Sequence, residues 1–180
     1  MLFELATQAF KLLRDAPVPT IAAVNGACVG AGVSLALSCD FVLAARAAFF
    51  LQAYIHLGLG PDMGASWFFA RSVGAARAFA LFALGERLPA QQAADWGLIH
   101  KCVDDAEFAG ELGTLSRKLA CGPTKGYGFV RELNRAACTN DLETQIELER
   151  RFYFTAKATA DAREAHLAYS EKRTPVFTGK

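Results

Sequence analysis

Residues 21–40 constrain the fold more than any other part of this sequence. They read IAAVNGACVGAGVSLALSCD, in which an apolar strand breaks at Asn25-Gly26 and a turn containing Gly30 and Gly32 opens into an apolar helix. Glycine permits positive φ and lets a ligand approach the backbone closely. The first N–H groups of a helix have no partner within it, so such a turn can hold a negatively charged oxygen. A tight strand-to-helix connection without any ligand is the alternative.

The composition bounds the class of protein. The chain has 180 residues, enough for one domain, and 53% of them are hydrophobic, enough for a sizeable core. Its 19 basic and 18 acidic residues leave a net charge of +1, so we expect no nucleic-acid partner and no attraction to a membrane. The five cysteines and three histidines lack metal-type spacing, which predicts reduced thiols, no metal site and a cytoplasmic location. No full G-x-G-x-x-G or Walker-type loop is present.

Hydrophobic periodicity and the placement of Gly and Pro predict the elements. We expect the strand at 20–24 to be of the kind that is buried on both faces. From residue 106 the sequence becomes more charged and more helical, as in an interaction module, and the aromatic cluster at 152–154 predicts an oligomer interface. The predicted helices cover residues 2–13, 29–38, 63–71, 75–84, 89–96, 106–120, 125–137, 142–155 and 159–169, and the strands 20–24, 40–44, 49–52 and 98–103.

An ordered set of short motifs covers nearly the whole chain. It comprises PTIAAVNG at 19–26, GAG at 30–32, LALSCD at 35–40, FLQ at 50–52, LGLGPDMG at 57–64, RSVG at 71–74, AADWGLI at 93–99, LACGPT at 119–124 and EKRTPVF at 171–177. With these motifs in this order, the sequence resembles the crotonase (enoyl-CoA hydratase/isomerase) superfamily.

The resemblance implies an α/β fold: a ββα spiral core over residues 1–122, followed by a helical oligomerisation region over 123–180 that builds a homotrimer or hexamer. Members bind acyl-CoA thioesters, as in fatty acid metabolism, with coenzyme A as part of the substrate and no covalently bound cofactor. Two backbone N–H groups stabilise the enolate oxyanion, and one of them maps to Ala31. The loop that carries the other is absent from this sequence, so we expect an N-terminally truncated spiral.

Asp62 is the leading catalytic candidate, because isomerase-like members and the 4-chlorobenzoyl-CoA dehalogenase place a working aspartate at the matching position. The alternative is structural, since a Pro61-Asp62 pair is also a typical start of a helix, with the aspartate as its N-cap. The two glutamates of hydratases fall at Ser34 and Tyr54, neither of which is a carboxylate base at neutral pH. The resemblance therefore favours a 1,3-proton shift, in which one carboxyl returns the proton that it took.

Further residues have two interpretations each. Tyr54 either helps to orient Asp62 and the substrate or is a core or interface tyrosine. Trp67 is expected in the core, with contact to the acyl group as the alternative, and Lys172 either reaches a phosphate of coenzyme A or is solvated. The remaining residues assigned to substrate binding surround the turn and are Ala27, Val29, Gly30, Gly32 and Ser34. For Ser34, the alternative is a serine that packs its helix against the rest of the fold.

Three other functions stay open. One is hydration, with Asp62 alone activating water. Dehalogenation is weaker, because it needs a histidine from the absent part of the family pattern. The third is a non-catalytic fragment or oligomerisation subunit, for which an acyl-CoA titration would show no saturable binding.

Overall fold

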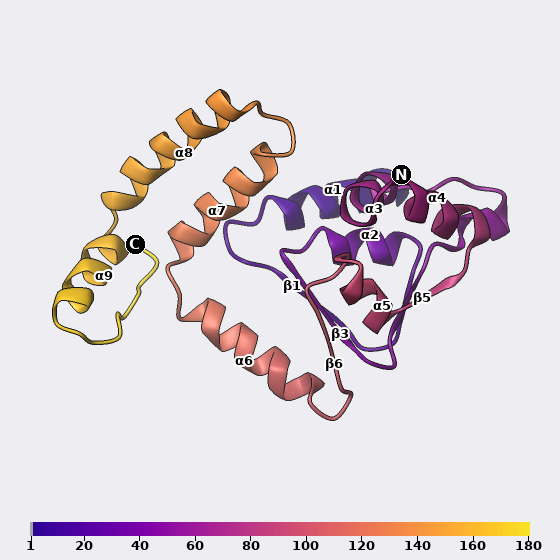
Figure 1. The fold of residues 1–180 in the computed structure, drawn as a ribbon, viewed down its shortest axis with the longest axis horizontal. Helices are drawn as coiled ribbons and strands as arrows, with labels where there is room; N and C mark the ends of the chain where they lie inside the picture. The colour runs from indigo at the N-terminus through magenta and orange to yellow at the C-terminus, as the bar shows by residue number, and fades with distance from the viewer. Residues whose placement is uncertain (1) are drawn as a thin grey trace. The chain divides into compact units, whose positions relative to one another are not determined.

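The computed structural model describes residues 2–180 and divides into two compact units. The first comprises residues 2–16 and Thr20–Gly113, and the second Pro17–Pro19 and Thr114–Lys180. Figure 1 colours both units along the chain. The division proposed from the sequence, a spiral core over 1–122 and an oligomerisation region over 123–180, stays a prediction.

Helices and short strands alternate through the first unit, and helices alone follow. The strands are β1 (Ile21–Val24), β2 (Ala27–Val29), β3 (Phe41–Ala45), β4 (Phe49–Leu51), β5 (Arg87–Pro89) and β6 (Lys101–Val103). The helices are α1 (Leu2–Arg14), α2 (Ala31–Leu37), the 3-10 helix η1 (Ala53–Leu57), α3 (Ala65–Val73), α4 (Ala75–Leu84), α5 (Ala90–Asp95), α6 (Phe108–Ala120), α7 (Thr124–Ala136), α8 (Leu142–Lys157) and α9 (Ala160–Ser170).

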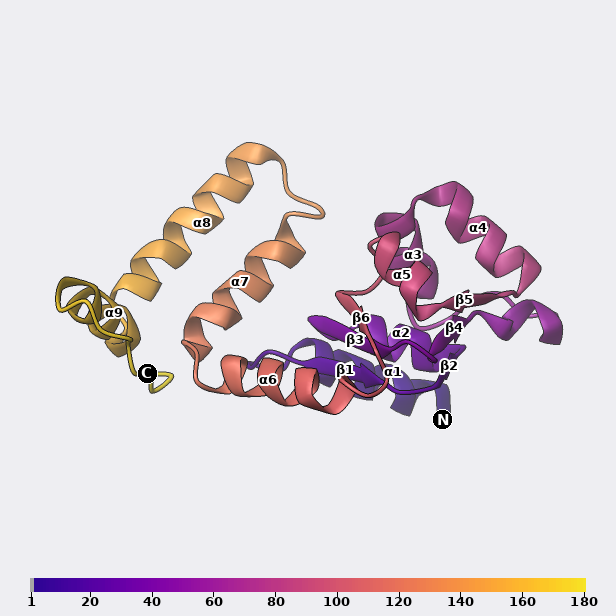
Figure 2. The same ribbon diagram turned by 60° about the horizontal axis from the view of Figure 1, so that its bottom comes forward.

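The strands form two three-stranded sheets. One has the order β1-β3-β6 with parallel pairs, and the other has the order β2-β4-β5 with β5 antiparallel (Figure 2). Ile21 is paired with Phe41 in the first sheet, and Ala27 with Phe49 in the second. One β–β–α unit (β1, β2, α2) thus stacks in parallel on the next pair of strands, which is the spiral architecture that the resemblance implies.

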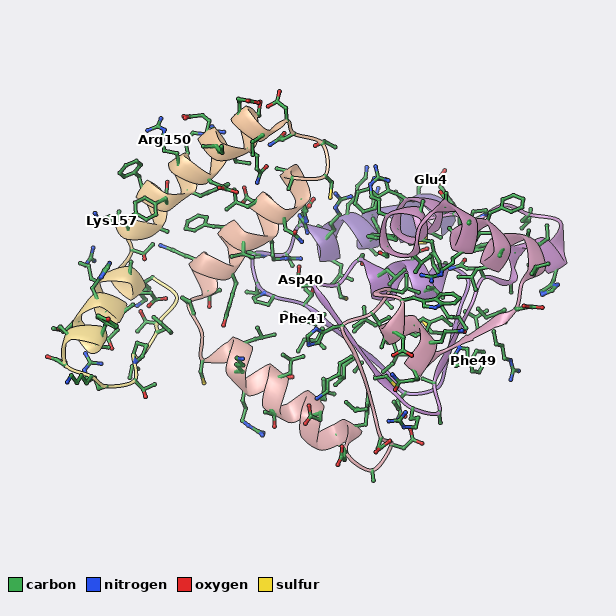
Figure 3. All side chains as sticks on the ribbon, in the orientation of Figure 1. Glu4, Asp40, Phe41, Phe49, Arg150 and Lys157 are labelled. Carbon is green, nitrogen blue, oxygen red and sulfur yellow. The ribbon has the colours of Figure 1, made fainter. Side chains whose placement is uncertain are left out.

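A side-chain contact fixes the register of β1 on β3. Asp40, directly before β3, accepts hydrogen bonds at Oδ2 from the Thr20 N–H at 2.7 Å and from the Thr20 hydroxyl at 2.9 Å. The Thr20 hydroxyl in turn lies 3.1 Å from the Asp40 N–H. Figure 3 labels Asp40 and Phe41 where the strand begins. The two parallel strands therefore start together.

The core of the first unit lies between the two sheets and helices α2 to α5. The prediction that β1 is buried on both faces is wrong: Val24 is buried, but Ala23 is exposed and Ile21 only half-buried. Among residues 2–180, β1 has a strand partner on one side only, so it is an edge strand. The largest fully buried side chains of the chain belong to Phe50, Phe69, Leu43, Leu88, Val33 and Ser34.

Helices α7 and α8 of the second unit lie side by side (Figure 1). Phe129 of α7 stacks on Phe152 of α8 with ring centroids 5.0 Å apart. The Asp141 carboxylate caps α8 by accepting from the Thr144 N–H at 2.8 Å, and the Thr159 hydroxyl caps α9. Both caps are of the type that stabilises helix starts. In the described part of the chain, no helix is long and apolar enough to cross a bilayer.

Candidate functional site

The glycine turn is anchored at the end of a strand that the sequence did not reveal. Strand β2 lies between Asn25-Gly26 and α2, so the strand does not open directly into a helix over 29–38 as predicted. Gly30 has φ 54, and its N–H donates to the Leu51 carbonyl at 2.9 Å. Helix α2 then starts at Ala31, whose N–H donates to no atom within residues 2–180. Within the described residues, the turn thus presents the Ala31 N–H as an unpaired backbone donor at a helix start, as the interpretation of Ala31 requires.

Asp62 is not a helix cap, contrary to the structural alternative. Helix α3 starts at Ala65 with Gly64 at its N-cap position and no side-chain capping bond. Two residues with positive φ, Met63 at 47° and Gly64 at 81°, separate Asp62 from the helix. The Asp62 carbonyl accepts from the Ala65 N–H at 2.9 Å, whereas its carboxylate makes no contact with the free N–H groups of α3 among the described residues. The carboxylate is therefore available for another role.

Tyr54 is the partner of that carboxylate. The phenol, carried by η1, donates a hydrogen bond to Asp62 Oδ1. Burial raises the pKa of Tyr54 well above its ordinary value, and the hydrogen bond and negative charge of Asp62 raise this pKa further. The phenol thus stays protonated, as a donor, throughout the neutral range.

The same phenol lies beside the glycine turn. A β-carbon built on Gly30 would lie 3.7 Å from both the Cζ and the hydroxyl oxygen of Tyr54. The structure therefore brings together the turn before Ala31, the Tyr54 hydroxyl and the Asp62 carboxylate. These groups come from three separate segments of the first unit.

Ser34 completes the cluster from the side of α2. It is fully buried, with 0% of its surface exposed, and its hydroxyl donates to the Asp62 carbonyl at 3.2 Å. A buried hydroxyl needs such a partner, because desolvating it without one is costly. The sequence assigned Ser34 to helix packing or to the substrate pocket, and did not reveal this contact with Asp62.

A pocket of about 480 Å³ opens beside the turn, between β1, β2 and α2. Two residues assigned to substrate binding, Ala27 and Gly32, line it, whereas Val29, Gly30 and Ser34 do not. Its wall consists of Leu13, Ile21, Ala22, Ala23, Val24, Asn25, Gly26, Ala27, Cys28, Gly32, Leu35, Ala36 and Cys39. The lining carries no charged side chain, so the pocket suits an uncharged group.

The expectation of Trp67 in the core is wrong. Helix α3 buries the face with Ala65, Phe69 and Val73, and Trp67 points elsewhere with 37% of its surface exposed. The Arg71 guanidinium lies 4.3 Å from the centre of its ring. Contact between Trp67 and an acyl group stays a prediction.

Lys172 belongs to the second unit. It follows α9 with φ 54, and its N–H donates to the Tyr169 carbonyl at 3.2 Å. This backbone hydrogen bond does not test the predicted contact of Lys172 with a phosphate of coenzyme A, which stays a prediction.

The sequence analysis assigned no role to Gln52, the last residue of the FLQ motif, between β4 and Tyr54. Only 2% of Gln52 is exposed, and neither its amide nitrogen nor its amide oxygen has a hydrogen-bond partner within residues 2–180. Buried amides in folded proteins are almost always paired, so this one is unusual. Its sequence signal is weak, a single polar residue at the end of the apolar strand Phe49–Leu51.

The parallel stacking of β–β–α units identifies a crotonase-type spiral, and the comparisons with known proteins agree. The sequence profile named Enoyl-CoA hydratase/isomerase matches residues 3–180. The crystal structure of an enoyl-CoA hydratase from Polaromonas sp. JS666 superposes with a TM-score of 0.93 at 36% identity, covering 98% of this chain and 68% of that one. The chain belongs to the enoyl-CoA hydratase/isomerase family.

Two relatives are more similar in sequence. The 1,2-epoxyphenylacetyl-CoA isomerase of Escherichia coli (strain K12) is 46% identical over 168 residues, which are 93% of this chain and 64% of that protein. A probable enoyl-CoA hydratase of Rhodobacter capsulatus is 42% identical over 168 residues, again 93% of this chain and 65% of that protein. The chain thus spans just under two thirds of the length of both relatives.

Proposed function

We propose that this chain acts on an acyl-CoA thioester and moves a carbon–carbon double bond by a 1,3-proton shift, with Asp62 as the acid and base. The observation that carries the proposal is the Asp62 carboxylate itself, which is not a helix cap and is held by the Tyr54 hydroxyl beside the Gly30 turn. The E. coli relative, 46% identical, is named as an isomerase of a CoA thioester, which supports this choice.

The reaction starts with the thioester carbonyl at the Ala31 N–H. A hydrogen bond from this donor acidifies the protons next to the carbonyl and stabilises the enolate that forms. The Asp62 carboxylate takes a proton from the α-carbon of a 3-enoyl chain. The C–H electron pair forms a double bond between the α-carbon and the carbonyl carbon, and the carbonyl π pair moves to the thioester oxygen, which gives a dienolate. The resulting carboxylic acid returns the proton to the γ-carbon, which leaves a conjugated 2-enoyl thioester. Atoms and charge balance without water or a further reactant.

Tyr54 orients the Asp62 carboxylate for this proton transfer. Its hydroxyl occupies Oδ1 of Asp62, while Oδ2 accepts no hydrogen bond from the described residues. The phenol therefore fixes the orientation of the carboxylate and leaves one oxygen for the substrate proton. Because burial and Asp62 raise the pKa of Tyr54, the phenol remains a donor while the carboxylate exchanges its proton.

Hydration is the second candidate, since the R. capsulatus relative is named as a probable hydratase. The resemblance places the two hydratase glutamates at the positions of Ser34 and Tyr54. In this structure both side chains instead make hydrogen bonds to Asp62. With one carboxylate in the cluster, the proton shift needs fewer groups than activation and protonation around a water molecule.

The experiment follows a 3-enoyl-CoA by the absorbance of its conjugated product, with chromatography to detect any 3-hydroxyacyl product. Asp62→Asn should lower kcat by at least about 10²-fold, the usual contribution of a general acid or base, while acyl-CoA binding is retained. Asp95→Asn is the matched control, because the side chain of this exposed aspartate of α5 hydrogen-bonds to Gln91 of the same helix, away from the candidate site.

Each outcome separates the alternatives. A conjugated product that depends on Asp62 supports the isomerase, and a hydroxyacyl product would assign hydration instead. Saturable binding without turnover in any variant would contradict catalysis by this chain alone, and no saturable binding would favour the non-catalytic subunit.

We also propose that the helices of the second unit mediate self-association into three or six chains. Tyr153 and Phe154 on α8 are 61% and 57% exposed, and Tyr169 on α9 is 86% exposed. The rings of Tyr153 and Phe154 lie in contact with centroids 5.4 Å apart, and contiguous exposed apolar side chains mark interaction surfaces. Sedimentation at micromolar concentration tests this proposal, and a clean monomer would contradict it.

A further inference from the structure

The carbonyl of Asp62 is held from two sides. The Ala65 N–H donates to it at 2.9 Å, and the Ser34 hydroxyl donates at 3.2 Å. A carbonyl oxygen has two lone pairs, so these two bonds occupy it fully. Ser34 is completely buried on α2, and this is its only side-chain hydrogen bond within residues 2–180. The contact therefore connects a rigid helix to the main chain of the proposed base.

The chain after Asp62 has an unfavourable conformation. Met63 has φ 47, in the left-handed region where the β-carbon of a residue with a side chain crowds the following carbonyl oxygen. Gly64, with φ 81, adopts the same region without that crowding. Strained residues of this kind persist only where the surrounding contacts determine the conformation. Ser34 supplies one such contact, immediately before the strained residue.

The sequence indicates the unstrained conformation that this segment would otherwise adopt. An aspartate that follows a proline and precedes a helix ordinarily caps that helix through its side chain. Such a cap would turn the carboxylate towards the free N–H groups of α3 and away from Tyr54. The Ser34 bond opposes this rearrangement, because it fixes the Asp62 carbonyl against α2 while the two left-handed residues delay the start of α3 to Ala65.

We propose that Ser34 is a positioning residue: by holding the Asp62 carbonyl, it keeps the Asp62 carboxylate on the Tyr54 hydroxyl and away from the start of α3. The proposal rests on the proposed function for its catalytic consequence, but the contact itself does not. The position that the resemblance assigns to a glutamate of hydratases thus carries a residue that shapes the site without touching the substrate.

The first measurement is independent of turnover. Tyr54 is titrated by phenolate absorbance, as the difference between each protein and the same protein carrying Tyr54→Phe. The hydrogen bond to Asp62 helps to raise the pKa of Tyr54, so releasing the carboxylate should lower this pKa towards the ordinary value of a tyrosine. We expect this decrease in Ser34→Ala and a smaller decrease in Ser34→Cys, whose thiol is a weaker donor of similar size.

Ser38→Ala is the matched control. Ser38 is also a buried serine near the end of α2, but its hydroxyl donates to the Leu35 carbonyl of the same helix at 2.7 Å. It should leave the Tyr54 titration unchanged, although it too removes a buried hydroxyl. If Ser34→Ala does not fold, Ser34→Cys provides the test, because it keeps the volume of the side chain.

The second measurement is the kinetic one. Ser34→Ala should lower kcat about 10-fold with KM within 2-fold, because the base is misplaced while the substrate contacts remain, and Ser34→Thr should restore part of kcat by supplying a hydroxyl. An unchanged Tyr54 titration in both Ser34→Ala and Ser34→Cys would overturn the proposal, whatever the activity. A shifted titration in a chain without any turnover would support the positioning role and contradict the proposed function alone.

Discussion

The Tyr54 hydroxyl donates to the carboxylate of Asp62, eight residues further along the chain, and this contact distinguishes Asp62 from a helix cap. Pro61-Asp62 alone would suit a helix cap, yet the cap position belongs to Gly64. This contact is the basis of the proposed function, in which the phenol orients the carboxylate for proton transfer.

Tyr54→Phe tests this contact directly. Removing the hydroxyl should lower kcat about 10- to 100-fold, because a hydrogen bond to a charged group contributes about 1.5–3 kcal/mol. KM should change little, since the ring and its packing against the glycine turn remain. Steady-state kinetics with a 3-enoyl-CoA measure both constants.

Tyr127→Phe is the control for that variant, because Tyr127 lies on α7 in the second unit, outside the candidate site. It should match the unmodified chain in kcat and in melting temperature. A kcat in Tyr54→Phe equal to that of the control would show that the phenol does not orient the base.

Ala31→Pro removes the proposed oxyanion donor with little other change. Ala31 is the first residue of α2, where proline is well tolerated because no helical N–H bond is lost. We expect kcat to fall by about 10²–10³-fold, the usual effect of deleting one oxyanion donor, while circular dichroism and melting temperature stay close to those of the unmodified chain.

Ala75→Pro gives the matched comparison. Ala75 is the first residue of α4 and, like Ala31, follows a glycine with positive φ at the N-cap position. Ala75 lies outside the candidate site, so the Ala75→Pro variant should keep the kcat of the unmodified chain. Equal losses of activity in the two variants would contradict a specific role for the Ala31 N–H.

Helix positions could be predicted from the sequence because periodic apolar residues and glycine or proline boundaries act locally. Gly85, for example, ends α4 with φ 59, as its position after an apolar run indicated. Strands β2 and β5 could not be predicted in this way, because each has three residues and is defined by its pairing with β4. Such pairing depends on residues far away in the sequence.

The residues of the candidate site could be predicted from the sequence, but the contacts between them could not. The resemblance indicated Asp62 and Tyr54, whereas local sequence favoured the helix cap that the structure excludes. The deciding contacts, from Tyr54 and Ser34 to Asp62, join segments that are 8 and 28 residues apart. Trp67 shows the same limit: the apolar run around it does not reveal that Phe69 takes the buried position.

The thiol of Cys28 should react more slowly than the thiols of Cys121 and Cys138. Burial raises the pKa of Cys28 to about 11, whereas Cys121 and Cys138 are exposed. Because the thiolate is the reactive form, iodoacetamide at pH 8 should label Cys121 and Cys138 and leave Cys28 unmodified until the chain is unfolded. Peptide mass spectrometry of native and guanidinium-treated protein measures this order. Rapid native labelling of Cys28 would contradict its burial.

The same thiol predicts a pH dependence of stability. The unfolded chain releases the Cys28 proton near its ordinary pKa of 9.0, but the folded chain retains it until about pH 11. The resulting stabilisation is complete below pH 9 and is lost as the pH rises through 11. Unfolding by urea at pH 8, 9.5 and 11 should show this loss, and Cys28→Ala should show a smaller one.

Glu164 ties the C-terminal segment 171–180 to α9. Its carboxylate accepts from two nitrogens of the Arg173 guanidinium and from the Val176 N–H at 2.9 Å. These bonds lower the pKa of Glu164 to about 2, with the Arg173 bond as the largest cause. Glu164→Gln should therefore release the segment around Val176, seen as faster amide hydrogen exchange there at neutral pH. The segment beyond it should stay protected, because buried Asp161 accepts from the Thr178 and Gly179 N–H groups at 2.7 and 2.9 Å.

The sign of the pH effect distinguishes this contact from a general loss of stability. A carboxyl whose pKa is lowered on folding stabilises the folded chain above its ordinary pKa of 4.5, and this contribution is lost as the pH falls towards 2. The difference in melting temperature between the unmodified chain and Glu164→Gln should therefore be largest at neutral pH and shrink below pH 4.5. Glu149→Gln, at an exposed position of α8, should show neither effect. A difference that persists unchanged at pH 3 would mean that Glu164 acts through packing rather than through its charge.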